Sequence, residues 1–535
     1  MNETPKTAVV VGGGISGLAT AALLAKAGMK VQLFEKREAV GGRTYIWRRD
    51  GFKFDMGPSW YLMPEAFEQF FNLMGTTAAA ELKLVRLDPA YQTRNEGDSD
   101  PIVVRENLEA NIELFESIEP GSGERLRAYL ESASATYELA LKHFLYTNFG
   151  NLKPFLNSDV LPRAARFIKH LLTSLDSFAG KHVKDDRLRK ILDFPAVLLG
   201  ASPYKTPSMY HLMTHVDMQV GVFYPQGGLY TIIEAIERLA VASGVEIHTG
   251  SPVSRIVTDG GRAVGVEVGV GSLAGRVVAA DVVIASADLH HVETKLLDER
   301  DRTLPEKWWR KREPGPSALL LYLGIKGQLP QLDHHTLLYT RDWKTNFAKV
   351  FRKADGQSVV PNPASLYLCM PSKTDPTVAP EGYENLFVLV PVAPDPAIGA
   401  GGVNGDGDAK LEAAADAVID QIADWCEIPD LRDRIVLRRT MGPQDFVTEM
   451  NAWSGTALGM AHTLRQSAFF RPKNYSRKVR GLYFVGHNTI PGIGLPMCLI
   501  GAELVYKHLT QDGSAGPTPG EIKPLPNAAW KALNR

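Results

Sequence analysis

Three glycines and one acidic residue near the start of the chain have the types and the spacing of a nucleotide-binding turn. Gly12, Gly14 and Gly17 follow the apolar run Ala8–Val11, and Glu35 closes a second apolar run. Glycines let the backbone approach a pyrophosphate, and the N-terminus of a following helix offers free N–H groups and a positive dipole. A carboxylate further along can bond ribose hydroxyls. The pattern predicts a site for the ADP half of a dinucleotide.

The elements that must position these residues are a strand, a glycine turn, a helix and a second strand. After Gly17 small and aliphatic residues recur at helical spacing as far as Gly28, and Val31–Phe34 is the second apolar run. Elements in this order form a βαβ unit. This context favours a ligand site over the alternative, a glycine-rich turn that binds nothing.

A second glycine pair and an arginine narrow the identity of the dinucleotide. Gly41, Gly42 and Arg43 come shortly after Glu35, and Phe54–Ser59 follows them. This succession is typical of two-domain flavoproteins of the amine-oxidase type, in which an arginine offsets phosphate charge where the chain passes the pyrophosphate. We therefore expect FAD. No cysteine or histidine stands at a clear attachment position, so we expect the FAD to bind non-covalently.

Length and composition limit the class of protein. The 535 residues suit two or three domains, and the formal net charge of −1 argues against a nucleic-acid partner. The three cysteines are far apart, which predicts a reducing compartment, the cytoplasm, without disulfides or a metal site. No apolar run approaches the roughly twenty residues that a membrane span needs. No apolar stretch precedes the first strand, so we expect no cleaved leader.

The order of the remaining patterns predicts a discontinuous architecture. Residues 86–222 are largely helical in pattern, whereas residues 296–474 contain long strands and one clear helix. We therefore predict an α/β fold with an α+β substrate domain built on an antiparallel sheet, a helical membrane-associating cap, and a Rossmann-like FAD-binding domain assembled from 1–85, 223–295 and 475–512. The tail, residues 513–535, is rich in glycine and proline, and we expect it to be flexible.

Several motifs spread along the chain resemble those of one family. The motifs are the first glycine turn with Gly41-Gly42-Arg43, Asp55–Ser59, Pro203-Tyr204, Pro207–Tyr210, Tyr224–Gly228, His334–Thr336, Ala379–Gly382, Gln466–Pro472 and Val485–Pro496. From about residue 6 to 510 the chain resembles phytoene desaturases of the bacterial and fungal type, which are FAD-dependent carotenoid desaturases among the amine-oxidase-like flavoproteins. The first motif is shared across the superfamily, whereas the last two are more particular to these desaturases.

The resemblance implies an enzyme that oxidises CH–CH groups of an acyclic C40 polyene. Hydride passes to FAD, and the adjacent carbon loses a proton; phytoene would become neurosporene or lycopene, with a quinone or oxygen as the final electron acceptor. No second glycine motif for a nicotinamide dinucleotide is visible. Together with the glycine motifs, the resemblance places FAD contacts at Gly12, Gly14, Ile15, Ser16, Gly17, Glu35, Lys36, Gly42, Arg43, Gly57, Pro58, Ser59, Val253, Gly486, Gly494, Leu495 and Pro496.

The last motif departs from many amine-oxidase relatives. Those relatives have an acid after the motif's first glycine, whereas here His487 and Asn488 follow Gly486. We therefore expect the flavin contacts in this region to come from backbone N–H groups near Gly494.

Candidate acids and bases are few, because a flavin performs the difficult chemistry itself. Glu131 and Asp217, in the helical region, are weak candidates to accept a proton, and each is first interpreted as a surface or salt-bridged group. His334 and His335 could suggest a metal site. Adjacent residues on a strand point to opposite faces, however, so we expect no metal there.

A hydrocarbon substrate requires a long apolar and aromatic groove. We expect a subset of the large aromatic residues to line it, with ordinary core packing as the alternative for each. The candidates are Trp308, Trp309, Phe347, Phe351, Trp453, Phe469 and Phe470.

A carotenoid substrate is dissolved in the membrane, and one predicted helix could provide contact with a membrane surface. Residues 163–175 combine basic residues with an apolar stripe, a pattern typical of helices that lie on anionic membranes. The alternative is a helix packed on its own domain with a solvated basic face. We expect a cytoplasmic, peripherally bound protein. The stripe consists of Phe167, Ile168, Leu171, Leu172 and Leu175.

Two other functions stay open. One is a related flavoenzyme on another isoprenoid, such as a C30 desaturase, a carotenoid isomerase or a saturase. The other is a non-enzymatic prenyl carrier like the Rab GDP-dissociation inhibitors, although Glu35 and Arg43 argue against it. The number of desaturation steps depends on tunnel length and chain register, which motifs do not encode.

Overall fold

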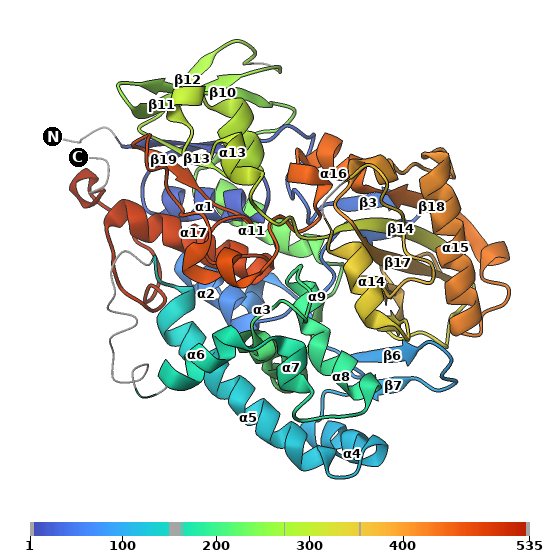
Figure 1. Cartoon of the computed structure of the whole chain (residues 1–535). Coiled ribbons are helices and arrows are strands. Elements are labelled where there is room, and N and C mark those ends of the chain that lie inside the picture. Colours follow the sequence, from blue (N-terminus) through green and yellow to red (C-terminus); the bar gives the residue numbers. More distant parts are fainter. Residues whose placement is uncertain (1–4, 149–161, 163, 272, 353–354, 531–535) are drawn as a thin grey trace.

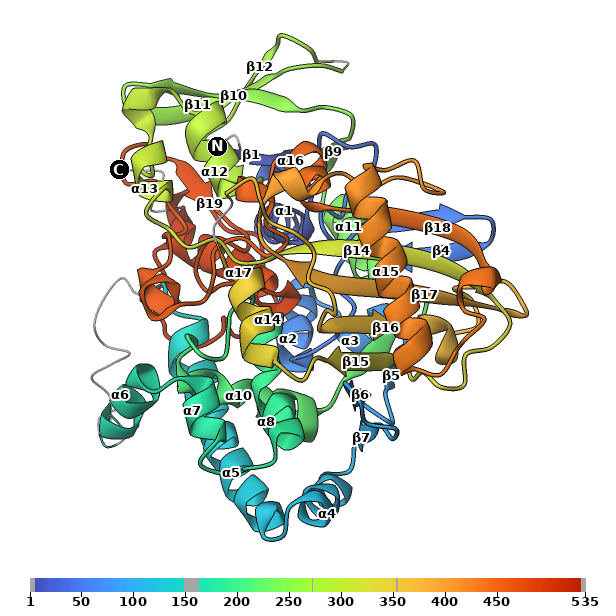
Figure 2. The ribbon, with the colours of Figure 1, turned by 45° about the vertical axis from the view of Figure 1, so that its right-hand side comes forward.

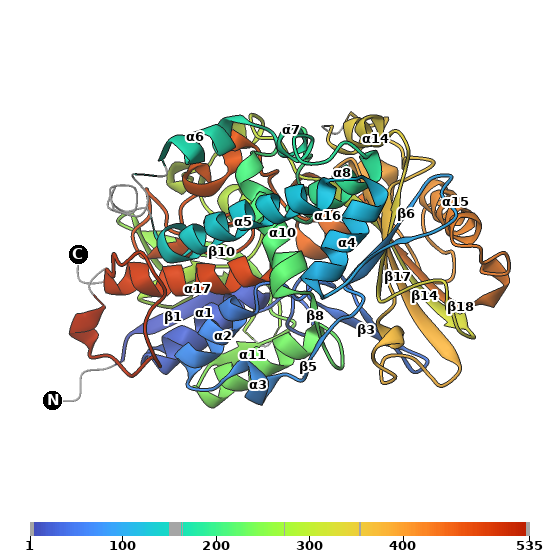
Figure 3. The ribbon, with the colours of Figure 1, turned by 90° about the horizontal axis from the view of Figure 1, so that it is seen from below.

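The computed structural model describes residues 5–148, 162, 164–271, 273–352 and 355–530 (Figure 1). In this part of the chain a parallel sheet with its helices, a seven-stranded sheet and a layer of helices surround a common interior. Figure 3 shows the helical layer on one side, the helices of the parallel sheet on the other, and the seven-stranded sheet standing beside both. The site lies where the three groups meet.

A five-stranded parallel sheet carries the glycine motif, with strand order β19-β13-β1-β2-β9. Its strands are β1 (Thr7–Val11), β2 (Lys30–Phe34), β9 (Glu246–His248), β13 (Val282–Ala285) and β19 (Leu482–Phe484). In the register, Val9 lies between Gln32 of β2 and Val283 of β13. Segments from three distant parts of the sequence are therefore neighbours in one sheet, and the predicted discontinuous Rossmann-like unit is confirmed.

Helix α1 (Ile15–Lys26) begins directly after the glycine turn, and its first eleven residues, from Ile15 to Ala25, are buried. It packs between α11 (Tyr230–Ala242) and α17 (Leu495–Thr510), because its four alanines and one glycine allow close approach from both sides. Gly28 follows the helix with φ +99°, a conformation that suits glycine, and turns the chain into β2.

The second sheet has the order β18-β14-β17-β16-β15-β6-β7. Its neighbouring strands are antiparallel except for the parallel pair β15 and β6. Helix α15 (Ala409–Trp425) covers one face and shares a buried aliphatic cluster with it (Figure 2). The strands are β6 (Tyr91–Asn95), β7 (Ile102–Val104), β14 (Ser317–Lys326), β15 (His335–Tyr339), β16 (Leu366–Cys369), β17 (Tyr383–Val392) and β18 (Ile435–Met441).

Strands β6 and β7 correct the prediction that residues 86–222 form only a helical cap. They extend the sheet at its β15 edge, far along the sequence from the strands that they join. Strands of five and three residues give too short a pattern to recognise in the sequence. Their backbone groups pair with the sheet edge whatever the sequence distance.

The helical layer begins after β7. Its residues pack against the two sheets and enclose the interior (Figure 3). The elements are α4 (Leu108–Ile118), α5 (Ser122–Ala140), η1 (Leu141–Leu145), α6 (Ala164–Leu172), α7 (Leu175–Ala179), α8 (Asp186–Asp193), α9 (Pro195–Leu198), η4 (Ser208–His211), α10 (Leu212–His215) and η5 (Val216–Val220).

Shorter elements connect these groups. The antiparallel sheet β10-β11-β12 and the pairs β3-β4 and β5-β8 lie outside the two main sheets. Their bounds are β3 (Ile46–Arg49), β4 (Phe52–Asp55), β5 (Leu84–Arg86), β8 (Phe223–Pro225), β10 (Val253–Asp259), β11 (Arg262–Val268) and β12 (Val277–Ala279), and the connecting helices are α2 (Pro64–Met74), α3 (Ala78–Glu81), α12 (Leu289–His291), α13 (Glu306–Trp309), α14 (Trp343–Val350) and α16 (Pro443–Met450).

The described part of the tail is packed, which corrects the prediction of a flexible segment from 513. The Ile522 N–H donates to the Leu73 carbonyl at 2.9 Å, and the Leu525 N–H donates to the Ala27 carbonyl at 2.9 Å. Ile522 and Trp530 are buried. The burial of Ile522 and Trp530 therefore holds the tail against the protein despite its glycine- and proline-rich composition. Residues 531–535 lie outside the described part.

Among the described residues, none of the helices combines the length and the apolar character that a membrane crossing requires.

Candidate functional site

One cavity of about 810 Å³ extends from the glycine turn to the inner face of the seven-stranded sheet. At one end it is lined by the loops that follow β1, β2, β13 and β19, where the carboxyl ends of parallel strands meet. At the other end it is lined by β14–β17, by α14 and by the helical layer, mostly with aliphatic and aromatic side chains. A single space therefore joins two chemically different halves.

The two glycine motifs meet backbone to backbone at the first end. Gly14 and Gly41 form a parallel bridge, and the Gly41 N–H donates to the Gly13 carbonyl at 2.8 Å. A Cβ on Gly42 would lie 3.0 Å from the Gly14 Cα. The absence of side chains leaves a flat cradle of backbone, which suits a pyrophosphate.

Glu35 lies at the end of β2 and faces the same space. Its Oε2 accepts the Gly13 N–H at 2.7 Å, and its Oε1 accepts the Arg37 N–H at 2.9 Å. Only 7% of the residue is exposed. The backbone thus holds the carboxylate in a fixed position at the cavity wall, where a ribose hydroxyl can approach it.

Gly17 has a different role from the one that the sequence predicted. It does not line the cavity, and a Cβ there would lie 2.0 Å from the Gly12 carbonyl oxygen, so the glycine allows α1 to begin close to β1. The other predicted FAD contacts line the cavity: Gly12, Gly14, Ile15, Ser16, Glu35, Lys36, Gly42, Arg43, Gly57, Pro58, Ser59, Val253, Gly486, Gly494, Leu495 and Pro496.

Arg43 provides positive charge beside the cradle. Its Nε and Nη2 are buried and have no hydrogen-bond partner among the described residues, while its Nη1 lies 3.4 Å from His487 Nδ1. Burial lowers the pKa of Arg43. Two buried donors without an acceptor, next to a glycine cradle, fit the phosphate groups of a dinucleotide.

A buried carboxylate that the sequence analysis missed faces this arginine region. Asp288 Oδ2 lies 3.7 Å from His487 Nε2, and the Asp288 side chain has no exposed surface. Burial favours a raised pKa for Asp288, but the proximity of His487 and the positive charge of Arg43 outweigh it, so the pKa is lowered. Burial and Arg43 lower the pKa of His487 to about 4, so this imidazole is neutral at pH 7.

Asp288 places a buried carboxylate beside His487, in the region where the sequence lacks an acid after Gly486. It follows β13, whose end adjoins that of β19 in the parallel sheet. The sequence did contain a signal for Asp288. The run at 280–286 was recognisable as a strand, and ligand-binding residues gather at the carboxyl ends of parallel strands. Ser286, Ala287 and His291 line the cavity from the same segment.

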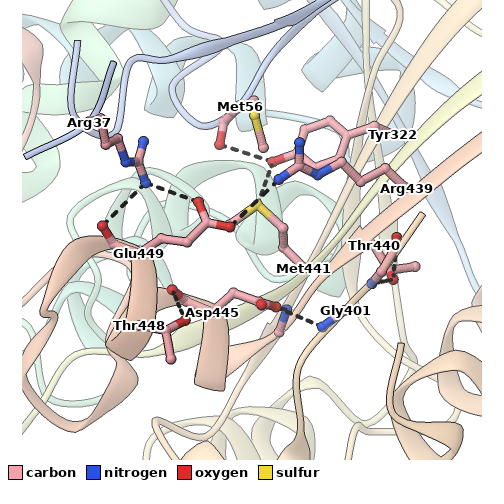
Figure 4. A network of polar contacts seen from close by, with 12 residues as sticks. Arg37, Met56, Tyr322, Gly401, Arg439, Thr440, Met441, Asp445, Thr448 and Glu449 are labelled. Carbon is pink, nitrogen blue, oxygen red and sulfur yellow. Dashed lines mark hydrogen bonds and ion pairs between the residues drawn. The ribbon is translucent and has the colours of Figure 1, made fainter. Parts of the chain in front are cut away.

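The loop Met56–Ser59 is held between the two halves of the cavity. The Tyr322 hydroxyl, from β14, donates to the Met56 carbonyl at 3.0 Å (Figure 4). The hydroxyls of Ser59 and Tyr367 are hydrogen-bonded at 2.8 Å. Strands of the seven-stranded sheet therefore position a loop that belongs in sequence to the dinucleotide-binding unit.

An ion-pair network makes a second link between these groups (Figure 4). Glu449, on α16, accepts from Arg37 Nη2 at 3.0 Å and lies 3.6 Å from Arg439 Nη2 of β18. Arg37 lies in the loop that follows β2, so Glu449 connects the loop beside Glu35 to the seven-stranded sheet. Arg37 and Glu449 both line the cavity.

The second half of the cavity uses only part of the predicted aromatic set. Phe347 and Phe469 line it. Phe351 stacks on Phe347 behind the wall, with ring centroids 5.5 Å apart. Trp308, Trp309 and Trp453 instead pack against one another in a separate buried cluster, and Phe470 is exposed. Additional aromatic lining comes from Trp60, Tyr137, Phe144, Phe167, Phe194, Tyr210, Tyr339, Trp343 and Tyr367.

His334 and His335 do not point to opposite faces as expected. His334 precedes β15, and the two ring centroids are 4.5 Å apart. Nitrogen atoms of both rings and the Cys369 sulfur lie within 4.8 Å of one another. His335 Nδ1 is hydrogen-bonded to the Tyr367 hydroxyl at 2.7 Å, so this histidine supports a residue of the cavity wall.

The structure separates the two carboxylates proposed as proton acceptors. Glu131 is exposed on α5, consistent with a surface group. Asp217, in η5, is only 2% exposed, and its Oδ2 accepts from the Tyr91 hydroxyl at 3.3 Å. The interpretation of Asp217 as a surface or salt-bridged group is therefore wrong. Asp217 nevertheless does not line the cavity and lies behind its wall.

The helix predicted to lie on a membrane is part of the cavity wall. Phe167 and Leu171 of α6 line the cavity, and Leu175 is buried in α7. Ile168 and Leu172 are 55% and 75% exposed. His170 is buried, with Nδ1 2.9 Å from Ser208 Oγ, so it does not belong to a solvated basic face. Arg163 and the side chain of Arg166 lie outside the described residues.

Comparisons with known proteins identify the family of this chain. The sequence matches the family of flavin-containing amine oxidoreductases over residues 15–504. It is 40% identical to a carotenoid 3,4-desaturase of Haloarcula japonica, over 94% of this chain and 98% of that protein. It is 38% identical to a zeta-carotene-forming phytoene desaturase of Myxococcus xanthus, over 97% of this chain and 98% of that protein.

A solved structure shares the fold at low identity. An oxidoreductase from Methanosarcina mazei superposes with a TM-score of 0.60 at 18% identity, covering 94% of this chain and all of that one. The chain therefore belongs to the flavin-containing amine oxidoreductases and, among them, to the FAD-dependent carotenoid desaturases of the bacterial and fungal phytoene desaturase type.

Proposed function

We propose that this protein desaturates an acyclic C40 polyene and converts phytoene to neurosporene or lycopene. The observation that carries the proposal is the single cavity that joins the dinucleotide cradle to a long apolar chamber. A hydrocarbon has no polar group by which to be held, so an enzyme must bind it by apolar contact along its length. The chamber's aliphatic and aromatic wall suits such a substrate.

The chain's own residues position the substrate and exclude water. When bound, FAD supplies the acceptor for a hydride. Leu320 of β14 and Leu389 of β17 line the cavity, and Leu389 is paired with Tyr367, whose hydroxyl is hydrogen-bonded to Ser59. The sheet can therefore hold one carbon–carbon bond against the cofactor region. The proton of the neighbouring carbon would be taken up together with the hydride, so that the substrate loses two hydrogens and the cofactor gains two without a dedicated side-chain base. A quinone or oxygen would be the final electron acceptor.

The substrate would enter from a membrane beside α6. Ile168 and Leu172 expose apolar side chains next to Phe167 and Leu171, which line the cavity. Phe469 and Phe470 add exposed aromatic surface, 39% and 53% exposed, and Phe469 also lines the cavity. An exposed apolar rim around a substrate chamber supports peripheral binding to a lipid surface.

The two parts of this rim are tied together by η4. Ser208 of η4 is hydrogen-bonded to His170 of α6, and Tyr210 interacts with Ser467, which directly precedes the segment with Phe469 and Phe470. A membrane-bound rim would therefore consist of α6 and residues 468–470.

Expression in a bacterium that accumulates phytoene tests the function. We expect conversion to neurosporene or lycopene, identified by absorbance and mass, and no conversion with the Gly14→Ala variant, whose added Cβ enters the dinucleotide cradle. A parallel host that makes the C30 analogue tests the alternative. Colour in the C30 host alone would replace phytoene by the shorter precursor, and unchanged polyenes in both hosts would refute the proposal.

The membrane contact is tested with the double variant Ile168→Ser, Leu172→Ser. We expect its co-sedimentation with phosphatidylglycerol-containing vesicles to fall about tenfold, because two apolar side chains leave the lipid. Substituting Phe167 or Leu171 would instead disturb the cavity. The matched control is Val241→Ser with Val277→Ser, since these valines are 56% and 55% exposed elsewhere on the surface. Equal sedimentation of both double variants and the wild type would exclude α6 as the anchor.

A further inference from the structure

Two histidines and one cysteine form a buried cluster behind the cavity wall, at the strand pair β15 and β16. His335 of β15 lies opposite Cys369 of β16 in the antiparallel register, and His334 directly precedes β15. These three residues, which we call the histidine–cysteine cluster, are at most 3% exposed. None of them lines the cavity, so the proposed desaturation gives them no role.

Each imidazole ring of the cluster has one nitrogen in a hydrogen bond and one without a partner. His334 Nδ1 lies 2.8 Å from Thr374 Oγ1, and His335 Nδ1 lies 2.7 Å from the Tyr367 hydroxyl. Both Nε2 atoms are buried without a hydrogen-bond partner among the described residues. When a hydroxyl accepts from Nδ1–H, the free electron pair stays on Nε2. Outer hydrogen bonds of this kind orient the histidines that ligate metals.

The ligand atoms of the cluster are close enough together to share one ion. A ring nitrogen of each histidine and Cys369 Sγ lie within 4.8 Å of one another. Around a tetrahedral zinc ion, with bonds of about 2.0 Å to nitrogen and about 2.3 Å to sulfur, the ligand atoms stand about 3.5 Å apart. Small rotations of the side chains close the difference. Imidazole and thiolate are ligands that zinc and copper prefer.

The surroundings of the histidine–cysteine cluster favour a divalent cation. Asp375 is 1% exposed and accepts the Tyr224 hydroxyl at 3.3 Å, and the centroid of the Tyr224 ring lies 4.7 Å from that of His334. Asp375 also accepts the Gly227 N–H at 2.5 Å, and it forms no ion pair within the described residues. A doubly charged ion on one thiolate keeps one positive charge, which this buried carboxylate can balance. Copper(I) would leave the carboxylate without a counter-charge.

A small cavity beside Cys369 gives room for a fourth ligand. Its volume is about 10 Å³, and it is also lined by Asp55, Ser59 and Tyr224. One water molecule needs about this volume, together with polar partners, which these side chains offer. Zinc sites with three protein ligands complete their tetrahedron with a water molecule. The cluster and the small cavity together therefore fit the coordination that zinc requires.

We propose that His334, His335 and Cys369 bind one zinc ion, with a water molecule as the fourth ligand. The zinc–sulfur bond forms as the Cys369 thiol releases its proton to solvent, and no oxidation state changes. The ion would tie β15 to β16 behind Tyr367, whose hydroxyl is hydrogen-bonded to Ser59. It would thus support the cavity wall without contacting substrate. The site differs from the expectation drawn from the sequence because the two histidine rings lie together.

The test measures the metal content of the untagged, FAD-loaded protein by mass spectrometry after purification without chelators. We expect about one zinc ion per chain in wild type and a content at least about tenfold lower in Cys369→Ser and in His334→Ala, because each change removes a ligand. Cys426→Ser is the matched control and should keep the zinc. Cys426 is also a fully buried cysteine, but it belongs to the aliphatic cluster beneath α15.

Cobalt(II) keeps the site testable in wild type if the variants fail to fold. Exchange of zinc for cobalt should give a thiolate-to-cobalt charge-transfer band and the d–d bands of a tetrahedral ion. Removal of zinc with 1,10-phenanthroline should lower the Tm, because the ion binds the folded state.

Three results would each overturn the zinc site. They are wild type that holds copper or no metal, cobalt-loaded protein without the thiolate band, and equal zinc in Cys369→Ser and Cys426→Ser. Conversion of phytoene is a separate measurement, so the proposed desaturase function would stand if the zinc site failed. Failure to convert phytoene would likewise leave the metal content as evidence for the site.

Discussion

The dinucleotide end of the cavity is built from backbone and a few buried charges, whereas the apolar end is built from many side chains of distant elements. At the first end Gly42 and Arg43 each have a contact that another residue type could not make. At the second end aliphatic and aromatic residues from the seven-stranded sheet, α14 and the helical layer share one surface. Single substitutions should therefore be severe in the cradle and mild in the chamber.

The strongest test of this comparison is Gly17→Ala. The added Cβ would lie 2.0 Å from the Gly12 carbonyl oxygen, so α1 must move away from β1. We expect a loss of about 3 kcal/mol or more in stability, seen as poor soluble yield and a lower Tm. Gly14→Ala is the control, because the nearest atom to its Cβ would be the Gly42 Cα at 3.9 Å. A Gly17→Ala protein that is as stable as Gly14→Ala would contradict the close packing described here.

Arg43→Ala should give the next largest effect. Removing the two buried, unpartnered donors Nε and Nη2 takes charge-assisted hydrogen bonds from the phosphates. We expect FAD affinity to fall about 100-fold, or about 2.7 kcal/mol, in a fluorescence titration of the apoprotein. Arg238→Ala, at an exposed arginine of α11, should leave the Kd unchanged. Equal Kd values for the two variants would remove Arg43 from the site.

We expect the stability of the folded protein to depend on pH through Asp55. Its carboxylate accepts the N–H groups of Leu229 and Tyr230, and burial raises its pKa from the usual 3.8 to about 6. Because the folded state binds this proton more tightly, the stabilisation is complete below about pH 4 and is lost as the pH rises through about 6. Asp55→Asn should therefore lose fewer degrees of Tm than wild type between pH 4.5 and 7.5. If the Tm of Asp55→Asn and the Tm of wild type changed equally with pH in differential scanning fluorimetry, this role of Asp55 would be excluded.

The smallest effect is expected in the chamber. Leu337→Val removes about one methylene from a wall shared by many residues, which corresponds to about 0.8 kcal/mol or at most about a fourfold drop in substrate kcat/KM. FAD affinity should be unchanged, because Leu337 lies on the substrate half of the cavity. A large loss of FAD from this variant would mean that the two halves are not independent.

The sequence was informative where the function depends on local backbone. The glycine turn, Glu35 and Arg43 could be located because their spacing follows from one βαβ unit and the loop after it. Gly17 was placed in the site, whereas its contact is with the Gly12 carbonyl. Helix-end packing and ligand contact both require glycine, so residue type alone does not separate the two roles.

Other parts of the site could not be predicted because they depend on contacts between distant segments. Asp288 reaches His487 only because β13 and β19 are neighbours in the sheet. Strands β6 and β7 were too short to recognise. Phe167 was predicted either to face a membrane or to pack on its own domain, whereas it lines the cavity. An amphipathic pattern shows that one face is covered, and it does not show whether a core, a cavity or a membrane covers it.

By itself the sequence determined the cofactor class, the discontinuous α/β fold and the family, because each is carried by short motifs whose backbone geometry is local. Only the tertiary structure decided which side chains form the chamber, where α6 stands and that His334, His335 and Cys369 gather behind Tyr367. Those features arise from side-chain packing among strands and helices that are far apart in the chain. The physical reason is that apolar burial is non-directional and leaves many partners possible, whereas a glycine cradle permits few.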